Sequence, residues 1–255
     1  MATRIDDSRL AERDQELVAP LRAEEERPRL FSLVRDEPLV VQHEPLFVPS
    51  AGTGARLCQR CLDVTVALVA LLLVWPLLLL GAVLVLASGP GPIFYSHRRL
   101  GRDGQVFGCI KLRTMRTDAD RILQELLRSS PAMMAEWVAD RKLRNDPRIT
   151  RIGQFLRRYS LDELPQLFNV LRGEMSIVGP RPLATDEAQH YGADYRLCFS
   201  VNPGITGLWQ VSGRNDVSYQ RRVELDCHYA TVRCLALDLS IMLRTIPVVL
   251  GGTGH

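Results

Sequence analysis

The apolar run VTVALVALLLVWPLLLLGAVLVLA, residues 64–87, decides the fold. It contains no charged residue, and Pro76 follows Trp75 near its centre. A straight helix of this length would measure roughly 36 Å, which is enough to cross a bilayer. Because proline removes a backbone N–H donor and clashes with the preceding turn, it kinks or breaks a helix. We therefore predict a membrane helix that is broken at Pro76.

The basic flanks of this run favour a particular topology. Arg56 and Arg60 precede the run, and Arg98, Arg99 and Arg102 follow it. Basic flanks prefer the cytoplasmic side of a membrane. Two basic flanks are best satisfied when both ends are cytoplasmic, as in a re-entrant hairpin over residues 56–88. A kinked single span is the alternative, since prolines are tolerated in membrane helices.

The first 55 residues mix charges with five prolines and show little periodicity, which predicts a disordered cytoplasmic tail. No signal peptide is visible in the charged first thirty residues. The net charge of +3 is too small to indicate a nucleic-acid partner. Cys58 and Cys61 have metal-site spacing but no completing pair, and the other four cysteines are expected to be reduced thiols.

Residues 89–250 are predicted to form a cytoplasmic domain. Short strands are expected at 93–95 and 106–110, around the turn Gly101–Gly104. A helix is expected over Asp118–Leu127. Two further helices are expected to be interfacial or packed against the core: an amphipathic one whose apolar stripe runs from Ile149 to Tyr159, and an apolar one over Leu235–Leu250. The fold class is therefore α+β, mainly helical, with a membrane helix-break-helix.

Ser160-Leu161-Asp162-Glu163-Leu164-Pro165-Gln166 places two adjacent carboxylates after a basic stretch. A carboxylate can attack a phosphate if positive charge gathers the phosphate and a metal screens the repulsion. Ser160-x-x-Glu163 also matches a capping box, which would put Asp162 in the first turn of a helix, where carboxylate and phosphate are both favoured. On the motif alone, an ordinary capped helix with acids in its first turn is slightly favoured over a catalytic site.

An ordered set of segments resembles the bacterial sugar transferases, the small monotopic phosphoglycosyl transferases. The resemblance covers Cys58 to about Pro247, and Trp75 stands where the family often has serine. The segments that carry it are Arg60-Cys61-Leu62-Asp63, Lys111-Leu112-Arg113-Thr114-Met115, Asp146-Pro147-Arg148-Ile149-Thr150, Leu156 to Gln166, Met175 to Pro182 and Pro203 to Arg214.

This resemblance implies an activity and a site. Members transfer a sugar-1-phosphate from a UDP-sugar to undecaprenyl phosphate, release UMP, and work at the cytoplasmic face of the bacterial inner membrane. Asp162 would be the nucleophile, with Glu163 and Mg²⁺ beside it. Membrane lipids are implied partners, and a homo-oligomer is allowed. The implied phosphate-binding residues are Lys111, Arg113, Arg157, Arg181 and Arg214, with Pro76, Pro180 and Pro182 in structural roles.

Two other classes of function compete with this one. Asp118-Ala119-Asp120 has the spacing of a metal-dependent Asp-x-Asp glycosyltransferase, which would release UDP instead of UMP. Acids at a helix start are favoured in any case, so a helix cap explains the same residues. The second rival is a membrane scaffold without catalysis, in which replacing Asp162 would change nothing.

Overall fold

The computed structural model describes residues 52–252, except 141–142, 144, 186 and 214–216. The predicted tail therefore lies almost entirely outside the described residues, as does Arg214. In chain order the elements are α2 (Thr53–Ala87), β1 (Phe94–Leu100), the 3-10 turn η2 (Arg102–Gly104), β2 (Val106–Leu112), α3 (Ala119–Ser129), α4 (Pro131–Asp140), α5 (Arg151–Arg158), the 3-10 turn η3 (Leu161–Glu163), α6 (Gln166–Arg172), β3 (Ser176–Val178), the 3-10 segment η4 (Ala188–Asp194), α7 (Tyr195–Cys198), β4 (Gly204–Thr206), α8 (Tyr219–Val232) and α9 (Leu235–Leu250).

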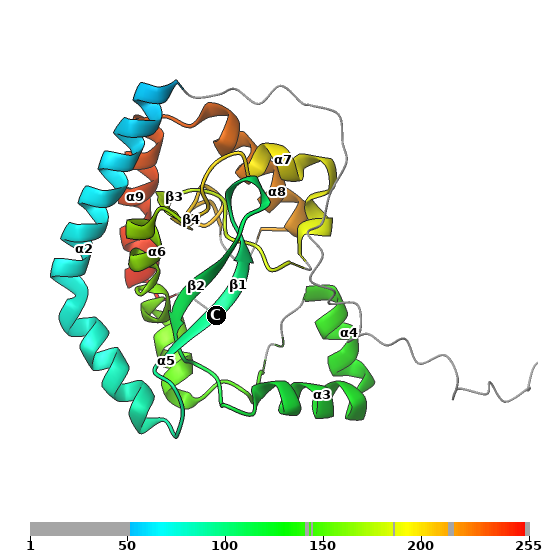
Figure 1. The fold of residues 1–255 in the computed structure, drawn as a ribbon. Helices are drawn as coiled ribbons and strands as arrows, with labels where there is room; N and C mark the ends of the chain where they lie inside the picture. The colour runs from blue at the N-terminus through cyan, green and yellow to red at the C-terminus, as the bar shows by residue number, and fades with distance from the viewer. Residues whose placement is uncertain (1–51, 141–142, 144, 186, 214–216, 253–255) are drawn as a thin grey trace, which may run out of the picture. The chain divides into compact units, whose positions relative to one another are not determined.

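The apolar run forms α2, a single helix that continues through Pro76. The prediction that the helix breaks at Pro76 is therefore wrong. A proline costs one backbone hydrogen bond, and a leucine-rich sequence with high helix propensity continues on both sides of it. Figure 1 shows that α2 bows as it passes α6, its main contact. Only 11% of its most apolar window is buried, so α2 is not the core helix of a soluble fold.

The N-terminal end of α2 is bonded to the rest of the folded domain by two side chains. The guanidinium of Arg60 donates to the carbonyl oxygens of Val170 and Leu171 at the end of α6. The buried carboxylate of Asp63 accepts hydrogen bonds from the Ser176 hydroxyl and, at 2.9 Å, from the Ile177 amide on β3. Because these donors and acceptors are buried or half-buried, the contacts fix where the helix begins on the domain.

The C-terminal end of α2 is held by Arg113, which directly follows β2. Its guanidinium donates to the carbonyl oxygens of Val85, Gly89 and Pro90. The last carbonyls of a helix have no partner inside the helix, and a cation there also complements the helix dipole. Both ends of α2 are therefore attached to the same folded domain.

The predicted hairpin is confirmed and is longer than expected. β1 and β2 pair antiparallel from Phe94↔Leu112 to Leu100↔Val106. The outer edge of β2 is covered by one side chain from α6: the amide of Asn169 accepts from the Ile110 N–H at 3.0 Å and donates to the Gly108 carbonyl at 2.8 Å. Asn169 thus pairs with this edge as a neighbouring strand would, and it fixes the strand against α6.

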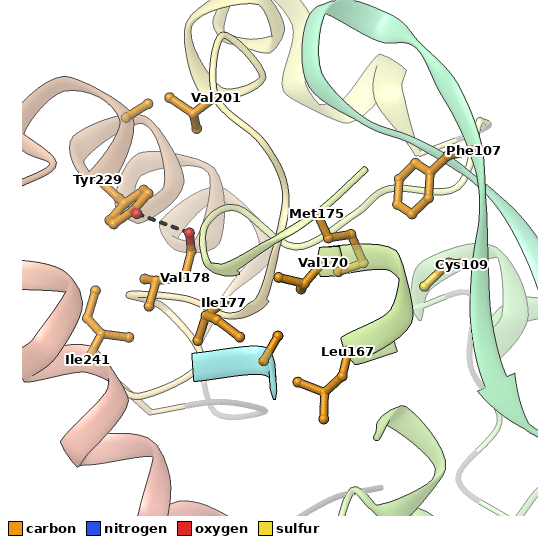
Figure 2. Packing of buried hydrophobic residues seen from close by; sticks show 12 residues of the cluster. Phe107, Cys109, Leu167, Val170, Met175, Ile177, Val178, Val201, Tyr229 and Ile241 are labelled. Carbon is orange, nitrogen blue, oxygen red and sulfur yellow. Dashed lines mark hydrogen bonds between the residues drawn. The ribbon is translucent and has the colours of Figure 1, made fainter. Parts of the chain in front are cut away.

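A second, parallel pair of strands lies inside the main core. Ser176 of β3 pairs with Gly204 of β4, and Val178 pairs with Thr206. Figure 2 shows Val178 and Ile177 between Ile241 of α9 and the side chains of α6. The hydroxyl of Tyr229 bonds the Val178 carbonyl at 3.1 Å, so α8 is tied to the same strand.

The remaining helices agree largely with the sequence. α3 and α9 occupy the predicted ranges, and the α5 stripe buries Leu156 while Phe155 stays half exposed. α9 carries an exposed apolar stripe at helical spacing: Leu235, Leu239, Leu243, Ile246 and Leu250. The expectation of four reduced thiols is corrected in part, because Cys198 of α7 and Cys227 of α8 form a disulfide.

Candidate active site

The two adjacent carboxylates lie in η3, a 3-10 turn between α5 and α6. Ser160 precedes this turn in the left-handed conformation, with φ of 56°, and its side chain makes no capping hydrogen bond. The predicted capping box is therefore wrong, because a capping residue needs extended backbone angles. A non-glycine residue in this region costs about 1–3 kcal/mol, and such strain is typical of functional turns.

Asp162 is the buried member of the pair, with 7% of its surface exposed. Burial raises the pKa of its carboxyl, and the neighbouring Glu163 raises it further, while Lys111 and Arg157 lower it. A carboxylate must be ionised to act as a nucleophile. Asp162 therefore depends on the two nearby cations for its charged form.

Glu163 faces two cations from other segments. Its Oε1 lies 2.6 Å from Nζ of Lys111 on β2 and 3.6 Å from Nη1 of Arg181, which follows β3. The Lys111 and Glu163 side chains are both more than four-fifths buried. Loss of one partner of an ion pair at this depth would leave the other charge buried without compensation. The fold thus gathers Lys111 and Arg181 at the dyad, as the sequence predicted.

Arg157 on α5 approaches the dyad from the other side. Its Nε donates to the Thr114 hydroxyl at 2.9 Å. Burial lowers the pKa of Arg157, while the charge of Asp162 raises it. The close packing of α5 on the segment after β2 depends on Gly153, because a Cβ there would lie 2.0 Å from the Thr114 carbonyl oxygen. Arg157 is therefore held close enough to Asp162 for the two charges to interact.

Five residues that were not predicted as site residues share a small cavity with Lys111 and Glu163. They are Arg99, Cys109, Gln166, Gly204 and Ile205. The alternation of side chains in paired strands was the signal that could have found the first two, since Arg99 and Cys109 share a face of the hairpin with Lys111. The cavity measures about 10 Å³, which is room for roughly one water. The ion pairs therefore close the site in this state.

One predicted residue is placed differently from expectation. Arg113 was expected to bind phosphate, but its buried guanidinium is bonded to the carbonyls that end α2. In this structure Arg113 therefore anchors the end of a helix, and its contact with phosphate stays a prediction. The prolines fit their structural roles: the Pro180 carbonyl accepts from the Gly204 N–H at 2.8 Å, and Pro182 lines the small cavity.

The side chains at the dyad fit a Mg²⁺ site only in part. Among the described residues, no group of three or more His, Cys, Asp or Glu side chains could hold a metal ion. Mg²⁺ is commonly bound by one or two carboxylates together with substrate phosphates and water. Asp162 and Glu163 supply two carboxylates of that kind. They could therefore hold Mg²⁺ once a diphosphate completes the ligand set.

The rival pair Asp118 and Asp120 lies at the exposed start of α3. The carboxylate of Asp118 pairs with Arg116 at 3.1 Å and with Arg121 at 2.8 Å. Hydrogen bonds from these two arginines lower its pKa. These contacts are ordinary surface ion pairs, and they favour the structural explanation of this motif over a metal site.

Comparison with known proteins gives a consistent result. The family model described as bacterial sugar transferase matches residues 54–252. The exopolysaccharide production protein ExoY of Sinorhizobium fredii is 52% identical over 207 residues, which are 80% of this chain and 92% of that protein. An undecaprenyl-phosphate galactose phosphotransferase of Salmonella typhimurium is 46% identical over 80% of this chain and 43% of its own length. A UDP-glucose:undecaprenyl-phosphate glucose-1-phosphate transferase of Caulobacter vibrioides is 40% identical over 79% of this chain and 73% of its own length.

Proposed function

This chain belongs to the bacterial sugar transferase family, and from that membership we propose that it transfers a hexose-1-phosphate from a UDP-sugar to undecaprenyl phosphate and releases UMP. Relatives named for exopolysaccharide production and for this transfer to undecaprenyl phosphate support the proposal. The observation that carries it is the buried Asp162, beside a Glu163 that contacts both Lys111 and Arg181.

The reaction proceeds in two displacements at one phosphorus. A carboxylate oxygen of Asp162 attacks the phosphorus that bears the sugar, and the bond from that phosphorus to the UMP oxygen breaks. UMP leaves, and an aspartyl-phosphosugar remains. The phosphate oxygen of undecaprenyl phosphate then attacks the same phosphorus and releases the Asp162 carboxylate. The covalent intermediate lets two anionic substrates react in sequence, so they need not occupy the site together.

The cations at the site offset the repulsion between carboxylate and phosphate. Lys111 and Arg181 can exchange Glu163 for diphosphate oxygens, and arginine can do so with two parallel hydrogen bonds. Lys111 and Arg157 favour the charged form of Asp162, because their charges lower its pKa against the effect of burial. Asp162 and Glu163 would hold Mg²⁺, which neutralises the developing phosphate charge when it is bound.

The attachment of both ends of α2 supports a re-entrant topology. Arg60 and Asp63 bind the domain at one end, and Arg113 binds the other end. A helix held at both ends by one domain returns to the side from which it came. The bow of α2 therefore dips into the bilayer, and the domain remains at the cytoplasmic face of the inner membrane. The site then lies at headgroup level, where undecaprenyl phosphate presents its charge.

A product assay tests the proposed reaction. Purified enzyme is given a panel of UDP-hexoses with undecaprenyl phosphate, and the nucleotide released is identified by chromatography. UMP together with a lipid-linked sugar diphosphate is expected. Release of UDP would establish the glycosyltransferase instead. Absence of turnover with every sugar, in enzyme that is shown to be folded and given Mg²⁺, would favour the scaffold.

A further inference from the structure

A second cavity, beside a cluster of charged side chains, lies at the N-terminal end of α2 and not at the dyad. It measures about 150 Å³, far above the ~10–15 Å³ that one water requires. It shares no lining residue with the small cavity beside Glu163. The proposed reaction gives this cavity no role.

Four arginines from three separate segments line the cavity: Arg56 and Arg60 from α2, Arg102 from the turn of the hairpin, and Arg233 from the end of α8. Asp63 is the one acidic side chain among the lining residues. Four positive groups against one negative group leave a marked positive excess. Guanidinium groups gathered in this way repel one another unless an anion lies between them, and their geometry matches phosphate.

Existing contacts satisfy only part of this charge. Arg60 is bonded to two backbone carbonyls, which carry no formal charge, and Arg102 pairs with the exposed Asp103 at 3.1 Å. Arg233 interacts electrostatically with the carboxylates of Asp63 and Asp238, and no hydrogen bond from its guanidinium is seen among the residues that the structure describes. The cavity therefore keeps cationic groups available for a ligand.

The surroundings indicate a lipid as the source of the phosphate. Arg60 lies one turn before Val64, where the charge-free run begins. Leu57, beside Arg56, is 65% exposed, and Leu235, two residues after Arg233, is 44% exposed. Gln59 of α2 bonds Asp238 of α9, so the exposed apolar stripe of α9 begins next to this cavity.

We propose that this arginine cavity binds the phosphate of an anionic phospholipid headgroup. The acyl chains of that lipid lie along the exposed apolar faces of α2 and α9. Each arginine near an anionic bilayer surface contributes attraction, and apolar contacts add to it. Binding of such a lipid would fix the depth at which α2 enters the bilayer. This inference concerns lipid binding alone and does not depend on the proposed reaction.

Native mass spectrometry of the full chain tests the site without turnover. The protein is released from neutral detergent after mixing with equal amounts of phosphatidylglycerol and phosphatidylcholine. Wild type is expected to retain phosphatidylglycerol as its first lipid. The pair Arg102→Gln and Arg233→Gln should weaken this retention roughly 30-fold, from two lost arginine contacts. If that double variant does not fold, Arg233→Gln alone should weaken it about fivefold.

A charge-matched control separates the cavity from general attraction. Arg121→Gln with Arg221→Gln removes the same charge from exposed helix surfaces, where each arginine already pairs with a glutamate. This control should retain phosphatidylglycerol as wild type does. Equal retention by the cavity variant and wild type, or equal loss in the control, would overturn the proposal. Displacement of the lipid by a millimolar excess of inorganic phosphate would show that free phosphate is the ligand, which would also overturn it.

Discussion

The ammonium of Lys111 on β2 lies 2.6 Å from Oε1 of Glu163, although 52 positions separate the two residues. The contact joins the hairpin to the turn that carries the dyad. It also fills the place where a substrate phosphate would arrive, in a cavity with room for roughly one water. Under the proposed function, a diphosphate that binds here would compete with Glu163 for Lys111 and Arg181.

Replacement of Asp162 gives the most direct test of catalysis. Asp162→Asn keeps the shape of the side chain but removes the attacking charge, so turnover should fall by several orders of magnitude. Release of UMP by purified enzyme measures this. Asp120→Asn, on the exposed start of α3, serves as the control and should leave turnover unchanged. Near-normal UMP release from Asp162→Asn would remove the nucleophile assignment.

Metal dependence follows from the two adjacent carboxylates. Chelation by EDTA should abolish activity, and added Mg²⁺ should restore it, because a diphosphate beside two carboxylates needs a hard cation. Glu163→Gln should lower activity and weaken the response to Mg²⁺ together. Turnover assays across a Mg²⁺ titration measure both effects. Full activity in EDTA, with divalent metal shown to be absent, would contradict this expectation.

The topology of α2 can be tested by labelling. Single cysteines at positions 56 and 102, in a background without the native cysteines, should both resist an impermeant reagent in spheroplasts. Pro76→Ala should leave both positions protected, because Arg60 and Arg113 hold the two ends of the helix. Labelling at position 56 but not at 102 would establish a single span.

Asn169 should matter for both stability and activity. Asn169→Ala leaves the Ile110 N–H and the Gly108 carbonyl without their partner, at about 1–3 kcal/mol for each group. Thermal unfolding in detergent measures this loss. Activity should also fall, since Ile110 directly precedes Lys111. Gln105→Ala, at the exposed hairpin turn, is the control and should change neither property. An unchanged melting temperature in Asn169→Ala would contradict the role of Asn169.

Asp226 should make stability depend on pH. Burial on α8 raises its pKa from 3.8 to about 7, while a hydrogen bond from Tyr191 and the charges of Arg181 and Arg222 lower it. The folded protein therefore holds a proton that the unfolded chain has lost, and stability falls as pH rises from about 4 to about 7. At 1.36 kcal/mol per pKa unit the loss is about 4 kcal/mol at most.

Asp226→Asn removes this titration while keeping an oxygen that can accept from Tyr191. The variant should therefore gain stability relative to wild type between pH 5 and pH 8, as measured by thermal unfolding at both pH values. Asp103→Asn, at an exposed carboxylate, should leave the pH profile unchanged. If the stability of Asp226→Asn changed with pH in parallel with that of wild type, Asp226 would be excluded as the source of the pH dependence.

The sequence predicted those elements that depend on local pattern. The alternation around Gly101–Gly104 predicted the hairpin, and the apolar periodicity of Leu235–Leu250 predicted α9. The neighbouring acids of the dyad could also be recognised, because adjacent charges before a proline stand out without any tertiary information. Each of these signals comes from residues that are close to one another in the sequence.

The sequence did not predict features that depend on distant partners. Lys111 and Arg113 are two residues apart, so strand alternation would place them on one face. β2 ends at Leu112, and Arg113 beyond it turns to the carbonyls of α2. Ser160 matched a capping pattern, yet its backbone adopts the left-handed conformation that the following turn requires. Neither outcome leaves a signal in the nearby residues.

The anchoring of α2 has a consequence for the order of events during biosynthesis. Arg113 follows its acceptor Val85 by 28 positions, whereas the acceptor of Arg60 at Val170 is 110 positions downstream. At about 5–20 residues per second, the ribosome needs roughly 5–20 s to deliver that second partner. The C-terminal end of the helix is thus fastened first. Its N-terminal end waits until α6 has emerged, so a nascent chain that stalls before Val170 would carry a helix tethered at one end only.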